Sequence, residues 1–205
     1  MPTETVGNDN TEKKNDDQPE ILSNSEIREI CERINNIKAV PVKYDEIAVI
    51  ETSMGTIKFK FFPDAAPNHC ASFKKLANNG FYDWTLFHRV AVNFVIQGGD
   101  IFSRNDDPSD DGSGDPGFNL DAEFSDISHK RGVVSTARQV NDVNTGNSQF
   151  FIMHANHPRL NGEYSVFGEV IEGIEVIDEI AEVPVRLSRP LDPVYIKKAR
   201  VIRGK

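Results

Sequence analysis

The sequence predicts a mainly β protein: a closed antiparallel β-barrel that carries two helices, with an extra helix ahead of it. Three observations predict this class. Short segments typical of strands recur from residue 46 onward, separated by turn residues. Only two segments within that stretch have helical spacing. One further amphipathic segment, near residue 25, stands apart from them and accounts for the extra helix.

Length and composition limit the function classes. The 205 residues suffice for one sizeable domain, and 38% hydrophobic with 27% charged residues is typical of a soluble globular protein. We expect no membrane span, because no run approaches about 18 apolar residues. A net charge of −9 argues against nucleic-acid binding, which needs clustered Lys and Arg. No signal peptide is visible, so we expect a cytoplasmic location, or an extracytoplasmic one if the N-terminus was trimmed.

The N-terminal part is expected to hold two segments. Residues 1–20 contain six acidic residues and two lysines without apolar periodicity, which predicts a disordered acidic tail. Residues 21–45 are predicted to form an amphipathic helix, over 25–37, and a linker. Its apolar face follows helical spacing: Ile27, Ile30, Cys31 and Ile34. A helix this short needs a docking surface, so we expect it to pack on its own domain, with self-association or a partner contact as the alternative.

Residues 46–205 are predicted to form the main domain. In the second strand Ile57, Phe59 and Phe61 alternate with polar residues, the pattern of a half-buried strand. A helix begins at Pro67 and ends at Gly80, and another lies near 173–181. The strands are expected at 46–52, 55–62, 85–91, 93–98, 132–137, 148–153, 164–171 and 194–203.

Three common kinds of site find little support. Ser148 lies in GNSQF, which is not the nucleophile motif of a hydrolase. His154 and His157 lack the glutamate and third ligand of a zinc site, so we interpret them as surface histidines. The acidic loop 105–115 does not fit an EF-hand, because Phe118 falls where the bidentate glutamate belongs. We interpret this loop as a solvated turn, and adventitious cation binding there stays open. Cys31 and Cys70 are expected to be free thiols.

One stretch combines residues that rarely occur together. FHRVAVNFVIQGGD, from Phe87 to Asp100, reads as a buried strand but contains Arg89 and Gln97. Because strand side chains alternate in direction, both could face an outer groove while their neighbours fill a core. The alternative is an outward arginine in a surface salt bridge. Two later segments, SQFFI and PRLNGEYSVFGEV, again place polar residues beside aromatic ones and favour the groove.

Together these motifs resemble the cyclophilins, the peptidyl-prolyl cis-trans isomerases. The resemblance extends over about residues 46–203, and GSGDPGFNLDAEF and STARQ are similar to the bacterial branch. It implies an eight-stranded antiparallel barrel capped by two helices, packed inside, with the substrate groove on the outside. It also implies rotation about X-Pro bonds without metal or cofactor. A non-catalytic module that binds proline peptides on the same fold is the alternative.

The resemblance also implies roles for individual residues. Arg89 matches the catalytic arginine, and Gln97 and Phe94 complete the catalytic set. The remaining matches would bind substrate: Val95, Ala137, Arg138, Gln149, Phe151, Leu160, Arg159 and Tyr164. Proline-containing peptides and flexible protein segments are the expected partners. Arg159 stands where many eukaryotic members carry tryptophan, which implies weak cyclosporin binding. Asn161 replaces an aspartate in a turn that suits either residue.

Overall fold

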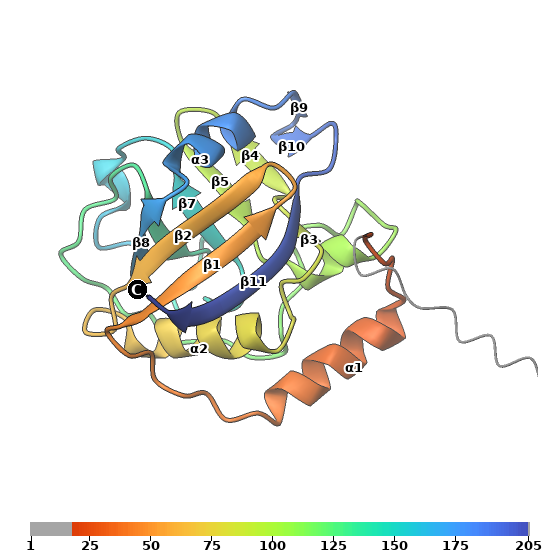
Figure 1. Cartoon of the computed structure of the whole chain (residues 1–205), viewed down its shortest axis with the longest axis horizontal. Helices are drawn as coiled ribbons and strands as arrows, with labels where there is room; N and C mark the ends of the chain where they lie inside the picture. The colour runs from red at the N-terminus through yellow and green to blue at the C-terminus, as the bar shows by residue number, and fades with distance from the viewer. Residues whose placement is uncertain (1–17, 205) are drawn as a thin grey trace, which may run out of the picture.

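The computed structural model describes residues 18–204 (Figure 1). Of the expected disordered tail, residues 1–20, the part from 1 to 17 therefore lies outside the described residues. Within 18–204, no helix is both long and apolar enough to cross a membrane. The helices described are α1 (Asn24–Asn35), α2 (Pro67–Asn78) and α3 (Ile174–Ala181), with short 3₁₀ helices η1 (Ile101–Arg104) and η2 (Pro158–Leu160).

The strands form one large antiparallel sheet and one small hairpin. The large sheet has the order β3-β11-β1-β2-β8-β6-β7-β5-β4, and β9 pairs with β10 alone. Their bounds are β1 (Glu46–Thr52), β2 (Gly55–Phe61), β3 (Thr85–Leu86), β4 (Arg89–Ala91), β5 (Val95–Gly98), β6 (Val133–Thr136), β7 (Phe150–Met153), β8 (Val166–Glu172), β9 (Val185–Arg186), β10 (Arg189–Pro190) and β11 (Tyr195–Arg203).

The single strand predicted over 85–91 is wrong in one respect: it is two short strands. β3 pairs with β11, whereas β4 pairs with β5, at the other end of the sheet order. Phe87 and His88 separate them, so both ends of the nine-stranded sheet lie on one continuous segment. The sheet consequently curls into an approximate barrel, which matches the expected eight strands when β3 and β4 are counted together.

The interior of the curled sheet is packed with side chains, as expected. Phe73 enters it from α2, and its ring centroid lies 5.1 Å from that of Phe59, 5.0 Å from Tyr82 and 5.6 Å from Phe150. Figure 1 shows α2 at one end of the barrel and α3 at the other. Because this interior is filled, any binding site must lie on the outside.

Helix α1 docks on its own chain. Ser23 caps it: the Ser23 side chain accepts from the amide of Glu26, and the Glu26 carboxylate accepts from the amide of Ser23. Ile27 and Ile34 from its apolar face are buried in the same apolar cluster as the barrel interior. Of the two arrangements expected for this helix, the described structure has the first, in which the apolar face packs in cis.

Candidate active site

The strand register explains the mixed stretch at Phe87–Asp100. Arg89 pairs with Gln97, Gln97 with Phe151, and Phe151 with Ser135, which places one row of side chains across four neighbouring strands. The residues next to them in sequence form a second row, buried in the core: Val90, Ile96, Ile152 and Val134. Because the two rows point to opposite faces of the sheet, Arg89 and Gln97 lie outside the barrel.

A cavity of about 230 Å³ opens on this outer face. Nine of the eleven residues assigned to the site from sequence line it: Arg89, Phe94, Val95, Gln97, Ala137, Arg138, Phe151, Leu160 and Tyr164. Val95 and Phe151 belong to a second apolar cluster, separate from the barrel interior, which also contains Val133, Met153 and Val166. The cavity therefore has apolar walls with a guanidinium and a carboxamide at its edge.

A chain of hydrogen bonds orients the polar groups of the cavity. The Gln149 Nε2 atom donates to the carbonyls of Gly112, at 2.9 Å, and Gly114, at 3.0 Å. Its Oε1 accepts from Gln97 Nε2 at 3.2 Å. The remaining Gln97 oxygen therefore faces Arg89, whose Nη1 atom donates to it at 3.4 Å. Gln149 itself does not line the 230 Å³ cavity but a neighbouring one.

Phe94 is placed by the two histidines of the H-x-x-H pair. Its ring lies 5.6 Å from the Arg89 guanidinium and 4.7 Å from the His157 ring. His157 Nε2 donates to the Asn93 carbonyl, at 2.7 Å, and His154 Nδ1 accepts from the Asn93 amide, at 2.8 Å. Both histidines thus hold the turn before Phe94. Among residues 18–204, no group of three or more His, Cys, Asp or Glu is arranged to hold a metal ion.

The opposite wall rests on a histidine that sequence reasoning missed. His129 is buried and stacks on Phe151, with ring centroids 6.1 Å apart, and its Nε2 atom lies 3.0 Å from the Ser135 hydroxyl. Burial lowers the pKa of His129, against a smaller opposite effect of its hydrogen bond to Asn161. Its sequence context, SDISHKRG, contains no motif that would reveal this supporting position.

The segment around η2 separates two of the assigned residues. Leu160 lines the cavity, whereas Arg159 is exposed and does not. Asn161 follows, and its side-chain oxygen accepts from the His129 amide at 2.8 Å. With φ of +74° at Gly162, this turn uses the glycine's conformational freedom. Asn161, which stands in place of the aspartate common in the resembled family, therefore still supplies an oxygen that accepts a hydrogen bond in this turn.

A second cavity, of about 320 Å³, adjoins the first and shares Gln97, Ala137 and Arg138 with it. Residues 112–115 form one of its walls. In the acidic loop that contains them, residues 106–109, 112, 113 and 115 are exposed, as a solvated turn requires, whereas Gly114 is buried. The returning part also contacts the barrel, through the ion pair of Asp111 with Arg189 and the hydrogen bonds that join Gly112 and Gly114 to Asp100 and Gln149.

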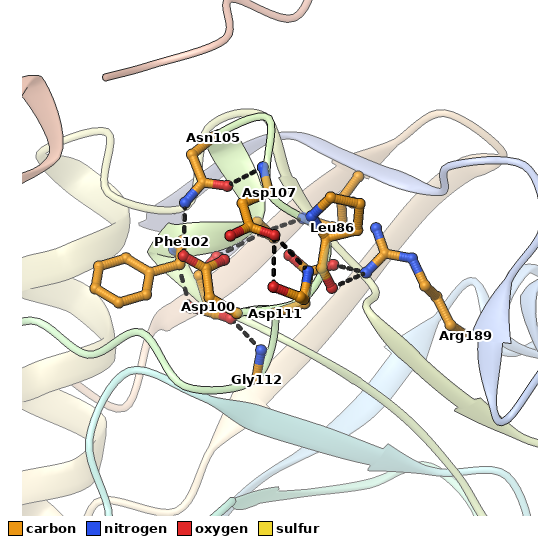
Figure 2. A network of polar contacts seen from close by, with 12 residues as sticks. Leu86, Asp100, Phe102, Asn105, Asp107, Asp111, Gly112 and Arg189 are labelled. Atoms are coloured by element: carbon orange, nitrogen blue, oxygen red, sulfur yellow. Dashed lines mark hydrogen bonds and ion pairs between the residues drawn. The ribbon is translucent and has the colours of Figure 1, made fainter. Parts of the chain in front are cut away.

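Asp100 anchors that returning part (Figure 2). Its Oδ1 atom accepts from the Phe102 amide at 2.9 Å, and its Oδ2 atom accepts from the Gly112 amide. Burial raises the pKa of Asp100 to about 7, although these two amides act in the opposite direction. Figure 2 also shows Arg189 pointing at Asp111, with which it forms an ion pair. Asp100 and the ion pair of Asp111 with Arg189 therefore hold the segment that forms the wall of the second cavity.

Comparison with known proteins identifies this arrangement. The family model described as cyclophilin type peptidyl-prolyl cis-trans isomerase matches residues 47–201. A Bacillus subtilis protein named peptidyl-prolyl cis-trans isomerase B is 45% identical over 121 residues, 58% of this chain and 78% of that protein. A Neurospora crassa protein named peptidyl-prolyl cis-trans isomerase-like 1 is 40% identical over 162 residues, 75% of this chain and 93% of that protein.

A solved structure supports the same assignment. The crystal structure of a Cryptosporidium parvum cyclophilin type peptidyl-prolyl cis-trans isomerase, in the presence of the dipeptide Ala-Pro, matches with a TM-score of 0.69 and 34% identity. The match covers 77% of this chain and 99% of that one. The motifs, the curled sheet with its outer groove and these similarities agree: the chain belongs to the cyclophilin-type peptidyl-prolyl cis-trans isomerase family.

Proposed function

We propose that the 230 Å³ cavity binds the proline ring of a peptide and that Arg89 is the catalytic residue for rotation about the X-Pro bond. One observation supports this proposal most directly: Gln97 holds the Arg89 guanidinium at the rim of an apolar cavity, beside the ring of Phe94. An arginine in a surface salt bridge would not need such a neighbour. Phe94, Val95, Phe151 and Leu160 supply the apolar surface on which a pyrrolidine ring can rest.

The chemistry requires little more than these groups. The X-Pro bond rotates against a barrier of about 18–20 kcal/mol because of its partial double-bond character. In the twisted state this resonance is lost, and the prolyl nitrogen becomes pyramidal and can accept a hydrogen bond. A guanidinium donor beside that nitrogen stabilises the twisted state more than either planar state, which is the differential binding that accelerates a reaction.

The two glutamines suit this role because they orient the donor in advance. Gln149 is held by two backbone carbonyls, so Gln97 receives a fixed partner and presents its oxygen to Arg89. A preorganised donor avoids reorganisation when the bond twists. Arginine fits better than lysine, since its planar fork holds one N–H on Gln97 and keeps others for the substrate.

We also infer the partners from this groove. Proline-containing peptides and flexible protein segments would enter it, with the residues flanking proline reaching the second cavity beside Gln149 and Arg138. Weak cyclosporin binding belongs to the same proposal, because the side chain at position 159 is an exposed arginine rather than tryptophan. Self-association through α1 is not part of it, since Ile27 and Ile34 on the apolar face of that helix are already buried in cis and Ile30 and Cys31 are half-buried.

The isomerisation rate of a short X-Pro peptide, followed by NMR exchange, tests this proposal. For Arg89→Ala we expect a loss of roughly 100- to 1000-fold, comparable to removing one preorganised donor. Arg89→Lys should recover only part of it. Arg203→Ala is the control, because that arginine is exposed and pairs with Asp45, and neither residue lines the cavity. Wild-type protein that binds the peptide without accelerating exchange would leave the non-catalytic module as the function.

A further inference from the structure

Helix α1 and the residues just before it precede the family-matched residues 47–201 and contact both ends of the loop that follows β5. Just before the helix, the Leu22 amide donates to the Arg104 carbonyl at 2.9 Å. Near its end, Asn35 Nδ2 donates to the Pro116 carbonyl at 2.9 Å, and the Cys31 thiol points at the Asp115 carbonyl at 3.7 Å. The N-terminal segment therefore holds this loop, residues 101–117, by contacts at its beginning and at its end.

Carboxylates surround the arginine at the first of these contacts. Arg104, in η1, is half-buried, and burial lowers its pKa, while the nearby carboxylates of Asp83, Glu20 and Glu26 act in the opposite direction. Two of these three carboxylates come from the N-terminal segment and one from the barrel. The beginning of the loop is thus held to the N-terminal segment by the Leu22 hydrogen bond, and these carboxylates partly offset the cost of burying the Arg104 guanidinium.

The end of the same loop is a wall of the groove. Residues 112–115 line the second cavity, and the carbonyls of Gly112 and Gly114 hold Gln149. Gly114 has no room to move toward the barrel, because a Cβ atom there would lie 2.1 Å from Asp100 Oδ1. Pro116, the residue that Asn35 holds, is only two positions further along. A displacement at Pro116 would therefore reach the Gly114 carbonyl directly.

We propose that Asn35 is a positioning residue: through Pro116 it holds the groove wall at 112–115 and so sets the affinity for residues that flank the substrate proline. This rests on the proposed function of the groove. The order of contacts is α1, Pro116, Gly114, Gln149 and Gln97, and only the last of these touches Arg89. Flanking-residue binding should accordingly depend on Asn35 more than the rate of bond rotation does.

The sharpest variant is Asn35→Asp, which replaces the amide donor by an acceptor facing the Pro116 carbonyl. Asn36→Asp is a matched control, since the Asn36 side chain donates to the Glu32 carbonyl of its own helix rather than to the loop. Both changes put a negative charge at the C-terminal end of α1, where it is unfavourable, so their effects on the helix itself are alike. The difference between the two variants isolates the contact with the loop. Asn35→Ala deletes the donor without added charge and serves if Asn35→Asp does not fold.

Two probes are needed: a peptide with three residues on each side of proline, and the dipeptide Ala-Pro, which is too short to fill both cavities. For the long peptide, Asn35→Asp should raise KM about three- to tenfold, the effect of one lost hydrogen bond, with a smaller effect on kcat. Binding of Ala-Pro should stay within twofold of wild type. The side-chain amide NMR signals of Gln149 should shift in Asn35→Asp and stay in place in Asn36→Asp.

Equal KM values in the two aspartate variants, with unshifted Gln149 signals, would overturn the proposal. A wild type that fails to catalyse exchange is a different result. It would reject the proposed function, while the Gln149 signals and the affinity for the long peptide would still report whether Asn35 positions the wall.

Discussion

Single residues in the groove are oriented by partners that leave them no alternative. Gln149 commits both N–H groups to backbone carbonyls, so only its oxygen remains for Gln97. Gln97 must then donate to Gln149 and accept from Arg89. The orientation of two carboxamides, and of the guanidinium beyond them, thus follows from the position of two glycine carbonyls. Glycine is required at 114, because any Cβ there would strike Asp100.

His88, the neighbour of Arg89, gives a pH-dependent prediction. Burial, and secondarily the charges of Arg189 and Arg89, lowers the pKa of His88 to about 4. Between this value and the ordinary pKa of about 6.5 the unfolded chain binds one proton more, so this group's contribution to stability rises with pH over that window and is lost as pH falls through 4. The slope is about 1.4 kcal/mol per pH unit at most.

The effect is measured as a difference, because Asp100, with its pKa raised to about 7, acts in the opposite direction over nearly the same window. Urea unfolding of wild type and His88→Leu at pH 4 to 8 gives the difference in unfolding free energy. It should grow in favour of wild type from pH 4 to 6.5 and stay level above. A constant difference would mean that His88 is protonated equally in both states.

At this scale the sequence predicts part of the site. Alternation along the strand suffices to place Arg89 and Gln97 on the outer face, since neighbours in a strand point to opposite faces. It does not reveal that Gln149 meets carbonyls 35 and 37 residues earlier in the chain, because backbone groups carry no sequence signal. His129 escapes prediction for a related reason: it acts by stacking on Phe151, a role that has no motif.

At the scale of elements, the sequence predicts helices and long strands better than the interruptions between them. Nothing in the sequence 85–91 marks a break, yet the strand changes pairing partner within it: Thr85 and Leu86 pair with β11, and Arg89 to Ala91 pair with β5. Between them, the Phe87 amide donates to the Val194 carbonyl. The β9-β10 hairpin was missed because its turn uses Leu187 and Ser188 at φ of 52° and 66°. Such turns normally contain Asn or Gly, so the usual signal is absent.

Two glycines at the boundaries of elements differ in why a side chain is unfavourable there: one only because of its positive φ, the other also because a Cβ atom would clash. Gly173 before α3 and Gly162 after η2 both have positive φ, 86° and 74°. A Cβ at Gly173 would lie 2.2 Å from the Thr56 carbonyl oxygen, whereas one at Gly162 would meet nothing within 4 Å. Gly162→Ala should therefore cost only the backbone strain, about 1–2 kcal/mol. Gly173→Ala should cost about 1–3 kcal/mol more, because β2 and α3 must move apart.

Urea unfolding of both variants measures the two costs. Equal losses would mean that β2 yields at Thr56 without cost, and that the boundary between β8 and α3 depends on backbone conformation alone.

In the whole molecule, the buried apolar side chains form two clusters, one that stabilises the fold and one that lines the groove. One cluster fills the barrel and extends to α1, and a smaller one lies under the outer groove. The order of the main helices and strands could be predicted from the sequence, because periodicity is a local property. The docking site of α1 could not, since an apolar stripe does not specify what covers it. Its burial in the barrel's own cluster predicts that helix and barrel unfold as one unit.

Ile34→Ala tests this, because Ile34 is fully buried in the shared cluster. Its truncation should lower the unfolding free energy by about 2–5 kcal/mol. The lower stability should also speed hydrogen exchange of the β6 and β8 amides, although these strands are not part of the helix, because cooperative unfolding exposes all elements together. Ile21→Ala is the control: Ile21 is 68% exposed, and its loss should change stability by no more than about 0.5 kcal/mol. If only α1 amides exchange faster in Ile34→Ala, the helix unfolds separately from the barrel, and its hold on the groove wall would vary with temperature independently of barrel stability.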